Sequence, residues 1–203
     1  MDTNENNSDY VDENQSLLII KEMIQVSKNR LKRDGILFIV WGWLLFYKSI
    51  LGYVERRFLL TFDMKKIMNY LGFALLIASI AFTSYYLLKQ RKKIQTYIGI
   101  SLRYVWISLL GCMVLVNLIQ FNVLHSINFE LQHPIFMVLM AFAVTVTGGI
   151  LRYRLFIIGG LIFGMLALAA SYLKLQEQLL VESVAWIISF IVPGHILYAN
   201  REK

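Results

Sequence analysis

The sequence predicts an all-α polytopic membrane protein with six transmembrane helices and an N-terminal amphipathic cytoplasmic helix. The chain has 203 residues, of which 58% are hydrophobic and 16% are charged, whereas a soluble domain usually carries about 25% charged residues. The apolar residues occur in blocks of roughly 20, the length that crosses a hydrocarbon core of about 30 Å. Basic residues gather at the ends of these blocks, as they do beside anionic lipid headgroups.

The first 34 residues are predicted to lie outside the membrane. Residues 1–15 form an acidic, polar tail that we expect to be disordered. Residues 16–34 differ from this tail, because Leu17, Ile20 and Ile24 recur at helical spacing among charged side chains. Lys32 and Arg33 suit the end of such a helix. We expect this amphipathic helix to lie on the membrane surface or on the protein's own loops, with docking to a partner helix as the alternative.

Residues 36–200 are predicted to form the six-helix transmembrane domain. The first span is rich in aromatic residues, among them Trp41, Trp43 and Tyr47, which are typical of membrane interfaces. The fourth span is expected to begin at Pro134, since the missing N–H of proline is harmless in a first turn. A link that contains Lys174, Glu177 and Glu182 is expected to lead to the sixth span. The predicted spans are about 36–54, 67–88, 102–124, 134–151, 155–173 and 179–199.

The distribution of Lys and Arg predicts the orientation. With both termini cytoplasmic, 14 of the 20 basic residues fall on the cytoplasmic side and 5 fall outside, as the positive-inside rule requires. Lys48 belongs to neither group, because it lies within the first span. We therefore expect a multi-pass membrane protein with both termini in the cytoplasm.

Three polar residues within the predicted spans form a tentative intramembrane site. Lys48 is the one basic residue well inside an apolar block, and such a charge is a functional hypothesis by default. Its long stem also suits snorkelling to the outer interface, which we favour over contact with a substrate or a lipid phosphate. Asn117 and Gln120 share one sector of the third span, where amides more often bond to a neighbouring helix than line a solute path.

Two glycine-containing motifs bear on helix packing. Gly160 and Gly164 are four residues apart, a spacing that lets helices approach closely. We expect internal packing from this pair rather than a homo-oligomer face, although a homo-oligomer remains the alternative. Pro193 and Gly194 interrupt the last span, where proline either bends a helix or marks a hinge.

Several classes of function lack their sequence signals. The lone Cys112 excludes an internal disulfide, and no nucleophile elbow, phosphate loop or zinc motif occurs. His125 and His133 lie in or beside one predicted outside loop, which a solvated loop explains better than a metal site. We expect no catalytic residues, no cofactor, no bound metal and no nucleic-acid partner.

Short motifs near both ends of the chain resemble an uncharacterised family of small bacterial inner-membrane proteins. They are Trp41-Gly42-Trp43 after the amphipathic segment and Pro193-Gly194 in the last span. The resemblance implies six spans and a bacterial membrane, and it transfers no activity and no site residues.

The expected function is that of a non-enzymatic regulatory or accessory membrane component. The basic amphipathic segment Ser16–Arg33 would engage a protein partner or anionic lipid. The alternative is a small permease or lipid-handling protein that uses Lys48, Asn117 and Gln120.

Overall fold

The computed structural model describes residues 18, 35–58, 61–90 and 97–199. The predicted acidic tail lies outside these residues, as does the predicted amphipathic helix except for Leu18. The described residues form helices and the turns between them, with no strand. The helices are Gly35–Arg57, α2 (Phe62–Gln90), α3 (Tyr97–Leu124), α4 (Phe129–Leu151), α5 (Arg154–Ala170), α6 (Leu175–Trp186), the π-helix η1 (Ile187–Ile191) and α7 (Val192–Ala199).

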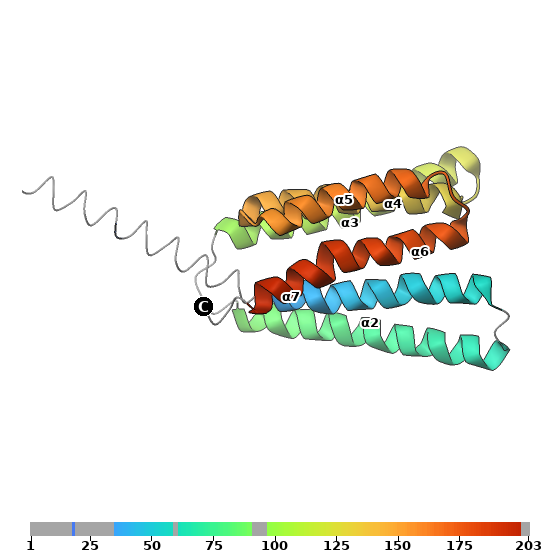
Figure 1. The fold of residues 1–203 in the computed structure, drawn as a ribbon, viewed down its shortest axis with the longest axis horizontal. Coiled ribbons are helices and arrows are strands. Elements are labelled where there is room, and N and C mark those ends of the chain that lie inside the picture. Colours follow the sequence, from blue (N-terminus) through green and yellow to red (C-terminus); the bar gives the residue numbers. More distant parts are fainter. Residues whose placement is uncertain (1–17, 19–34, 59–60, 91–96, 200–203) are drawn as a thin grey trace, which may run out of the picture.

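The helices run alternately up and down along one axis (Figure 1). We call the end of the bundle that holds Gly35 and Ala199 the terminal end, and the other the distal end. The distal end contains the turns after Arg57, Leu124 and Ala170. Both ends of the helical domain therefore lie at the same end of the bundle.

Five helices are long and apolar enough to cross a membrane, counting α6, η1 and α7 as one run. The remaining helix, α5, is apolar but has 17 residues, which corresponds to about 25 Å. Large apolar side chains are exposed along α2 and α3, including Phe73, Ile107 and Phe121. Water would make such surfaces unfavourable, whereas lipid tails would solvate them. The all-α fold is therefore consistent with a multi-pass membrane protein.

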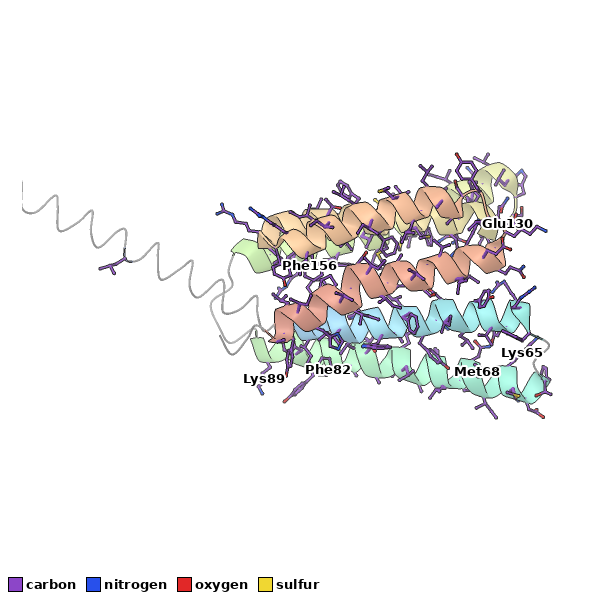
Figure 2. The ribbon with its side chains drawn as sticks, viewed as in Figure 1. Lys65, Met68, Phe82, Lys89, Glu130 and Phe156 are labelled. Atoms are coloured by element: carbon purple, nitrogen blue, oxygen red, sulfur yellow. The ribbon has the colours of Figure 1, made fainter. Side chains whose placement is uncertain are left out.

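The core lies between α4, α5 and the α6–α7 run (Figures 1 and 2). Phe156, Phe163 and Phe190 are almost fully buried there. The Trp186 ring packs edge-on against Phe163 and Phe190, each with ring centroids 5.0 Å apart, an arrangement that aromatic pairs prefer. Phe38 of the Gly35–Arg57 helix packs on Phe156 at 4.4 Å and so joins this helix to the core.

The turn between α4 and α5 brings these two helices into close contact. Arg152 adopts the left-handed conformation with φ 52°. The Tyr153 N–H donates to the Gly148 carbonyl at 2.9 Å, which is the backbone hydrogen bond of a Schellman motif at a helix C-terminus. The helices α4 and α5 lie side by side and approach closely at Gly160. A Cβ atom added to this glycine would lie 2.7 Å from the backbone nitrogen of Thr145. Gly164 faces the Cβ atom of Ala141 at 3.5 Å. Both glycines of the predicted motif therefore lie at the contact between α4 and α5.

The Gly35–Arg57 helix joins two neighbours. On one side Gly42 lies against Phe190 and Ile191, where a Cβ atom would approach within 2.9 Å of Phe190. On the other side the helix pairs with α2 through hydrogen bonds, two of which come from aromatic side chains. Trp41 Nε1 donates to Thr83 at 3.0 Å, and the Tyr47 hydroxyl donates to the Met68 carbonyl at 3.1 Å.

Several helix boundaries differ from the predicted spans. The helix α2 begins at Phe62 rather than near residue 67, and α3 begins at Tyr97 rather than near residue 102. Asn128 caps α4 by accepting from the Leu131 N–H at 3.2 Å, so the helix begins at Phe129 and Pro134 lies inside it. The next helix, α5, ends at Ala170 rather than near residue 173. The helix α6 begins at Leu175, so Glu182 is part of a helix and not of a link. Polar side chains lowered the local hydropathy at these helix starts and concealed their helical character.

The last helical run changes direction before its proline (Figure 1). Residues 187–191 form a π-helical turn directly ahead of Pro193, and π-turns are a common cause of helix bends. The Ser189 hydroxyl in this turn donates to the Gly159 carbonyl at 2.7 Å. Gly194 permits close contact with the Gly35–Arg57 helix, because a Cβ atom would lie 3.2 Å from the backbone nitrogen of Ile39.

Candidate functional site

Polar side chains of α3, α4 and α6 gather at the distal end of the bundle. We call this group the distal polar cluster. Its members come from the last turns of α3, from the first turns of α4 with its cap, and from α6. The turns 125–128 and 171–174 bring the starts of α4 and α6 to one end. The residues are Asn117, Gln120, Asn128, Gln132, His133, Gln178, Glu182 and Trp186, together with the backbone carbonyl of Glu130.

One half of the cluster joins α3 to α4. Gln132 Nε2 donates to Asn117 Oδ1 at 2.6 Å, and the Asn117 amide donates to the Met113 carbonyl of its own helix at 3.1 Å. Gln120 is buried, and its Oε1 accepts from the Asn128 N–H at 3.2 Å. The two amides predicted from the sequence are thus brought together, where their oxygens bond to α4 and to its cap.

The other half of the cluster joins α4 to α6, and it depends on Pro134. Pro134 has no N–H, so the Glu130 carbonyl one turn earlier lacks its usual helical donor. Gln178 of α6 supplies a donor instead, with its Nε2 at 3.0 Å from the Glu130 oxygen. The same nitrogen also donates to the Leu173 carbonyl at 3.0 Å. Gln178 is 1% exposed, and this buried amide holds α6 against α4 beside Glu130. Figure 2 labels Glu130 at the distal end of the bundle.

An ionisable pair continues the contact between α4 and α6. His133 Nδ1 lies 3.2 Å from Glu182 Oε2, with 26% and 16% of the two side chains exposed. The indole N–H of Trp186 donates to the other carboxylate oxygen at 3.3 Å. Glu182 is seven residues after the start of α6, about 10 Å along the helix axis. The carboxylate therefore lies well inside an apolar helical run.

The contact between His133 and Glu182 differs from what the sequence predicts. His133 is expected beside a solvated loop and Glu182 in a link, whereas both lie on helices. The sequence does carry a signal for the α6 part of the cluster, because Gln178, Glu182 and Trp186 are spaced four apart and share one helical face. A helix over residues 175–186 places these three side chains next to one another.

Lys48 lies elsewhere, on the face of the Gly35–Arg57 helix that meets α2. Its Nζ is 3.6 Å from the position that a Cβ of Gly72 would occupy. The 2.6 Å hydrogen bond from Asn69 to Glu55 fixes the register of this antiparallel pair and sets residue 48 level with about residue 76. Gly72 is closer to the distal end, so the Lys48 stem is directed about 6 Å that way. This is the direction that snorkelling requires.

The remaining histidines are separate from the cluster. His125 is exposed in the turn after α3 with φ 50°, and His195 Nδ1 lies 2.8 Å from the Ile191 carbonyl of its own helical run. Within residues 35–58, 61–90 and 97–199, no three His, Cys, Asp or Glu side chains gather as a metal site would require.

Comparisons with known proteins found no match to a family model, to a curated protein or to a solved structure.

Proposed function

We propose that the chain crosses a bacterial cytoplasmic membrane six times with both termini in the cytoplasm. Gly35 and Ala199 lie at one end of the bundle, which supports an even number of crossings. In this proposal α5 is the fifth span, and its length of about 25 Å requires slight thinning of the bilayer or burial against its neighbours. Phe156, Phe163 and Ala170 bury one face of this helix against its neighbours, whereas Leu161, Met165 and Leu168 are exposed. The residues 16–34 would form the amphipathic helix at the cytoplasmic surface.

The proposed function is that of a non-enzymatic regulatory or accessory membrane component. The observation that carries this proposal is that polar side chains in the described bundle form hydrogen bonds that hold the helices together. Asn117, Gln120 and Gln178 all bond between helices or to helix caps, which is the structural role of amides in membrane proteins. The polar groups thereby support a scaffold. Engagement of a protein partner or of anionic lipid is assigned to Ser16–Arg33.

Gentle extraction followed by native mass spectrometry tests this proposal. A co-purifying protein at fixed stoichiometry is the expected result, and it should be lost from a chain that lacks residues 1–33. Full rescue of every null phenotype by that truncated chain would contradict the proposal. The amount of truncated protein in the membrane serves as the control for folding.

The second candidate is a permease or lipid-handling protein, and one observation favours it. Lys48 is exposed beside Gly72 within the pair formed by the Gly35–Arg57 helix and α2, where its ammonium can contact a lipid phosphate. In proteoliposomes, Lys48→Leu should abolish lipid or solute flux under this second function while leaving the amount of folded protein unchanged. Under the accessory function no such flux is expected from either protein. Equal loss of flux and of folded protein would assign Lys48 a structural role.

A further inference from the structure

The contact between α4 and α6 has more hydrogen-bond acceptors than donors. Glu182 Oε2 is buried without an aligned hydrogen bond among the described residues, and so is Gln178 Oε1 one helical turn before it. The Gln178 amide cannot reverse to supply a donor, because both partners of its nitrogen are carbonyl oxygens. Because His133 Nδ1 lies 3.2 Å from Glu182 Oε2, a proton on this nitrogen can satisfy that acceptor.

The charge of the pair formed by His133 and Glu182 also favours binding of a proton. If His133 is neutral, its Nδ1–H can donate to the carboxylate, but the pair then carries a net negative charge within a helical membrane span. An unbalanced buried charge is costly, and an imidazolium beside the carboxylate removes the imbalance. The imidazole is also the side chain whose charge ordinarily changes between about pH 5 and 8.

No other cation compensates Glu182 in the part of the chain that the structure describes. Arg56 is exposed and donates to the Gly52 carbonyl, while Glu55 accepts from Asn69. Glu130 and Glu177 have exposed side chains, and the Glu177 carboxylate accepts from the Lys174 N–H. The charged residue of α5 is Arg154, at the terminal end. The other titratable side chains on the surrounding elements are Arg103, Tyr104 and Cys112 of α3, Tyr47, Lys48, Tyr53 and Arg57 of the Gly35–Arg57 helix, His125, Arg152, Tyr153, Tyr172 and Lys174 of the turns, and His195 and Tyr198 of α7.

We propose that His133 and Glu182 form a reversible proton-binding site that strengthens the contact between α4 and α6 when it is loaded. The ligand is a proton taken from the solution at the distal end, and it resides on the imidazole. No bond other than N–H forms or breaks. Loading converts a negatively charged pair into a neutral ion pair, and Trp186 remains hydrogen-bonded to the other carboxylate oxygen in both states. This inference goes beyond the proposed function and does not depend on it.

The test is the pH dependence of thermal unfolding of the full chain in nanodiscs. Acidification from about pH 8 to pH 6, where imidazoles gain their proton, should raise the melting temperature of the wild type. We expect a rise of roughly 2–4 °C. His133→Gln keeps a hydrogen-bond donor beside Glu182 but cannot gain a charge, so its melting temperature should not rise. His125→Gln is the matched control, since it removes an exposed turn histidine and should behave as the wild type.

Glu182→Gln provides a readout that a merely structural role would not give. In this variant acidification places a charge on His133 with no counter-charge, so the melting temperature should fall over the same pH range. The reversal of sign supports the proposal. The same rise in the wild type and in His133→Gln would overturn it, and that comparison decides the question even if Glu182→Gln does not fold.

Discussion

Replacing Gly160 with alanine should destabilise the protein more than any other single methyl addition along α5. The new Cβ would lie 2.7 Å from the backbone nitrogen of Thr145 and 2.9 Å from the Ala141 carbonyl oxygen. These are backbone atoms that no side-chain rotation can move away, so α4 and α5 must separate. Overpacking of this kind typically costs about 1–3 kcal/mol, occasionally more. The cost should be measured as the change in the free energy of reversible unfolding in mixed micelles.

Gly164→Ala is the matched control on the same helix. A Cβ at this position meets Ala141 at 3.5 Å, which is ordinary van der Waals contact. Gly111→Ala adds a methyl group where no atom lies within 4 Å. Both controls should stay within about 0.5 kcal/mol of the wild type. Equal stability of all three variants would mean that α4 and α5 do not pack as closely as described.

The second large effect should come from Gln178→Leu. This change removes both hydrogen bonds of the amide nitrogen and leaves the Glu130 carbonyl without a donor, because Pro134 supplies none. An unsatisfied buried acceptor costs roughly 1–3 kcal/mol. Leucine fills a similar volume, so the loss should arise from the hydrogen bonds rather than from a cavity. The measurement is again the free energy of unfolding.

A double-mutant cycle with Pro134→Ala isolates this mechanism. Alanine restores an N–H at position 134 that can donate to the Glu130 carbonyl within α4. Gln178→Leu should therefore cost less in the Pro134→Ala background than in the wild type, by roughly 1 kcal/mol. The same cost in both backgrounds would exclude the proline-freed carbonyl as the reason for the contact.

Much of the architecture could be predicted from the sequence, because apolar block length and helical rise are simply related. All six blocks are helical, including the segment from Ile67 to Leu88 within α2. The helix starts were less predictable. Asn128 caps α4 well before Pro134, and polar residues after Lys174 lowered the hydropathy of a segment that is nevertheless helical.

The candidate site was only half accessible to sequence reasoning. Asn117 and Gln120 share a helical face, so their proximity follows from periodicity alone. The contact of His133 with Glu182 depends on the packing of α6 beside α4, which no local pattern encodes. The link between Pro134 and Gln178 depends on the same long-range packing. This relation can be inferred only from the positions of α4 and α6 in the structure.

Site-directed thiol labelling on intact cells tests the central claim, a bundle in which α5 crosses the membrane between α4 and α6. Single cysteines in a Cys112→Ala background would replace Gly149, where a side chain meets no atom within 4 Å, and Tyr172, which is 84% exposed. An impermeant reagent should label position 172 from outside, and position 149 only after the membrane is permeabilised. Labelling of both positions from the same side would contradict the six-span arrangement.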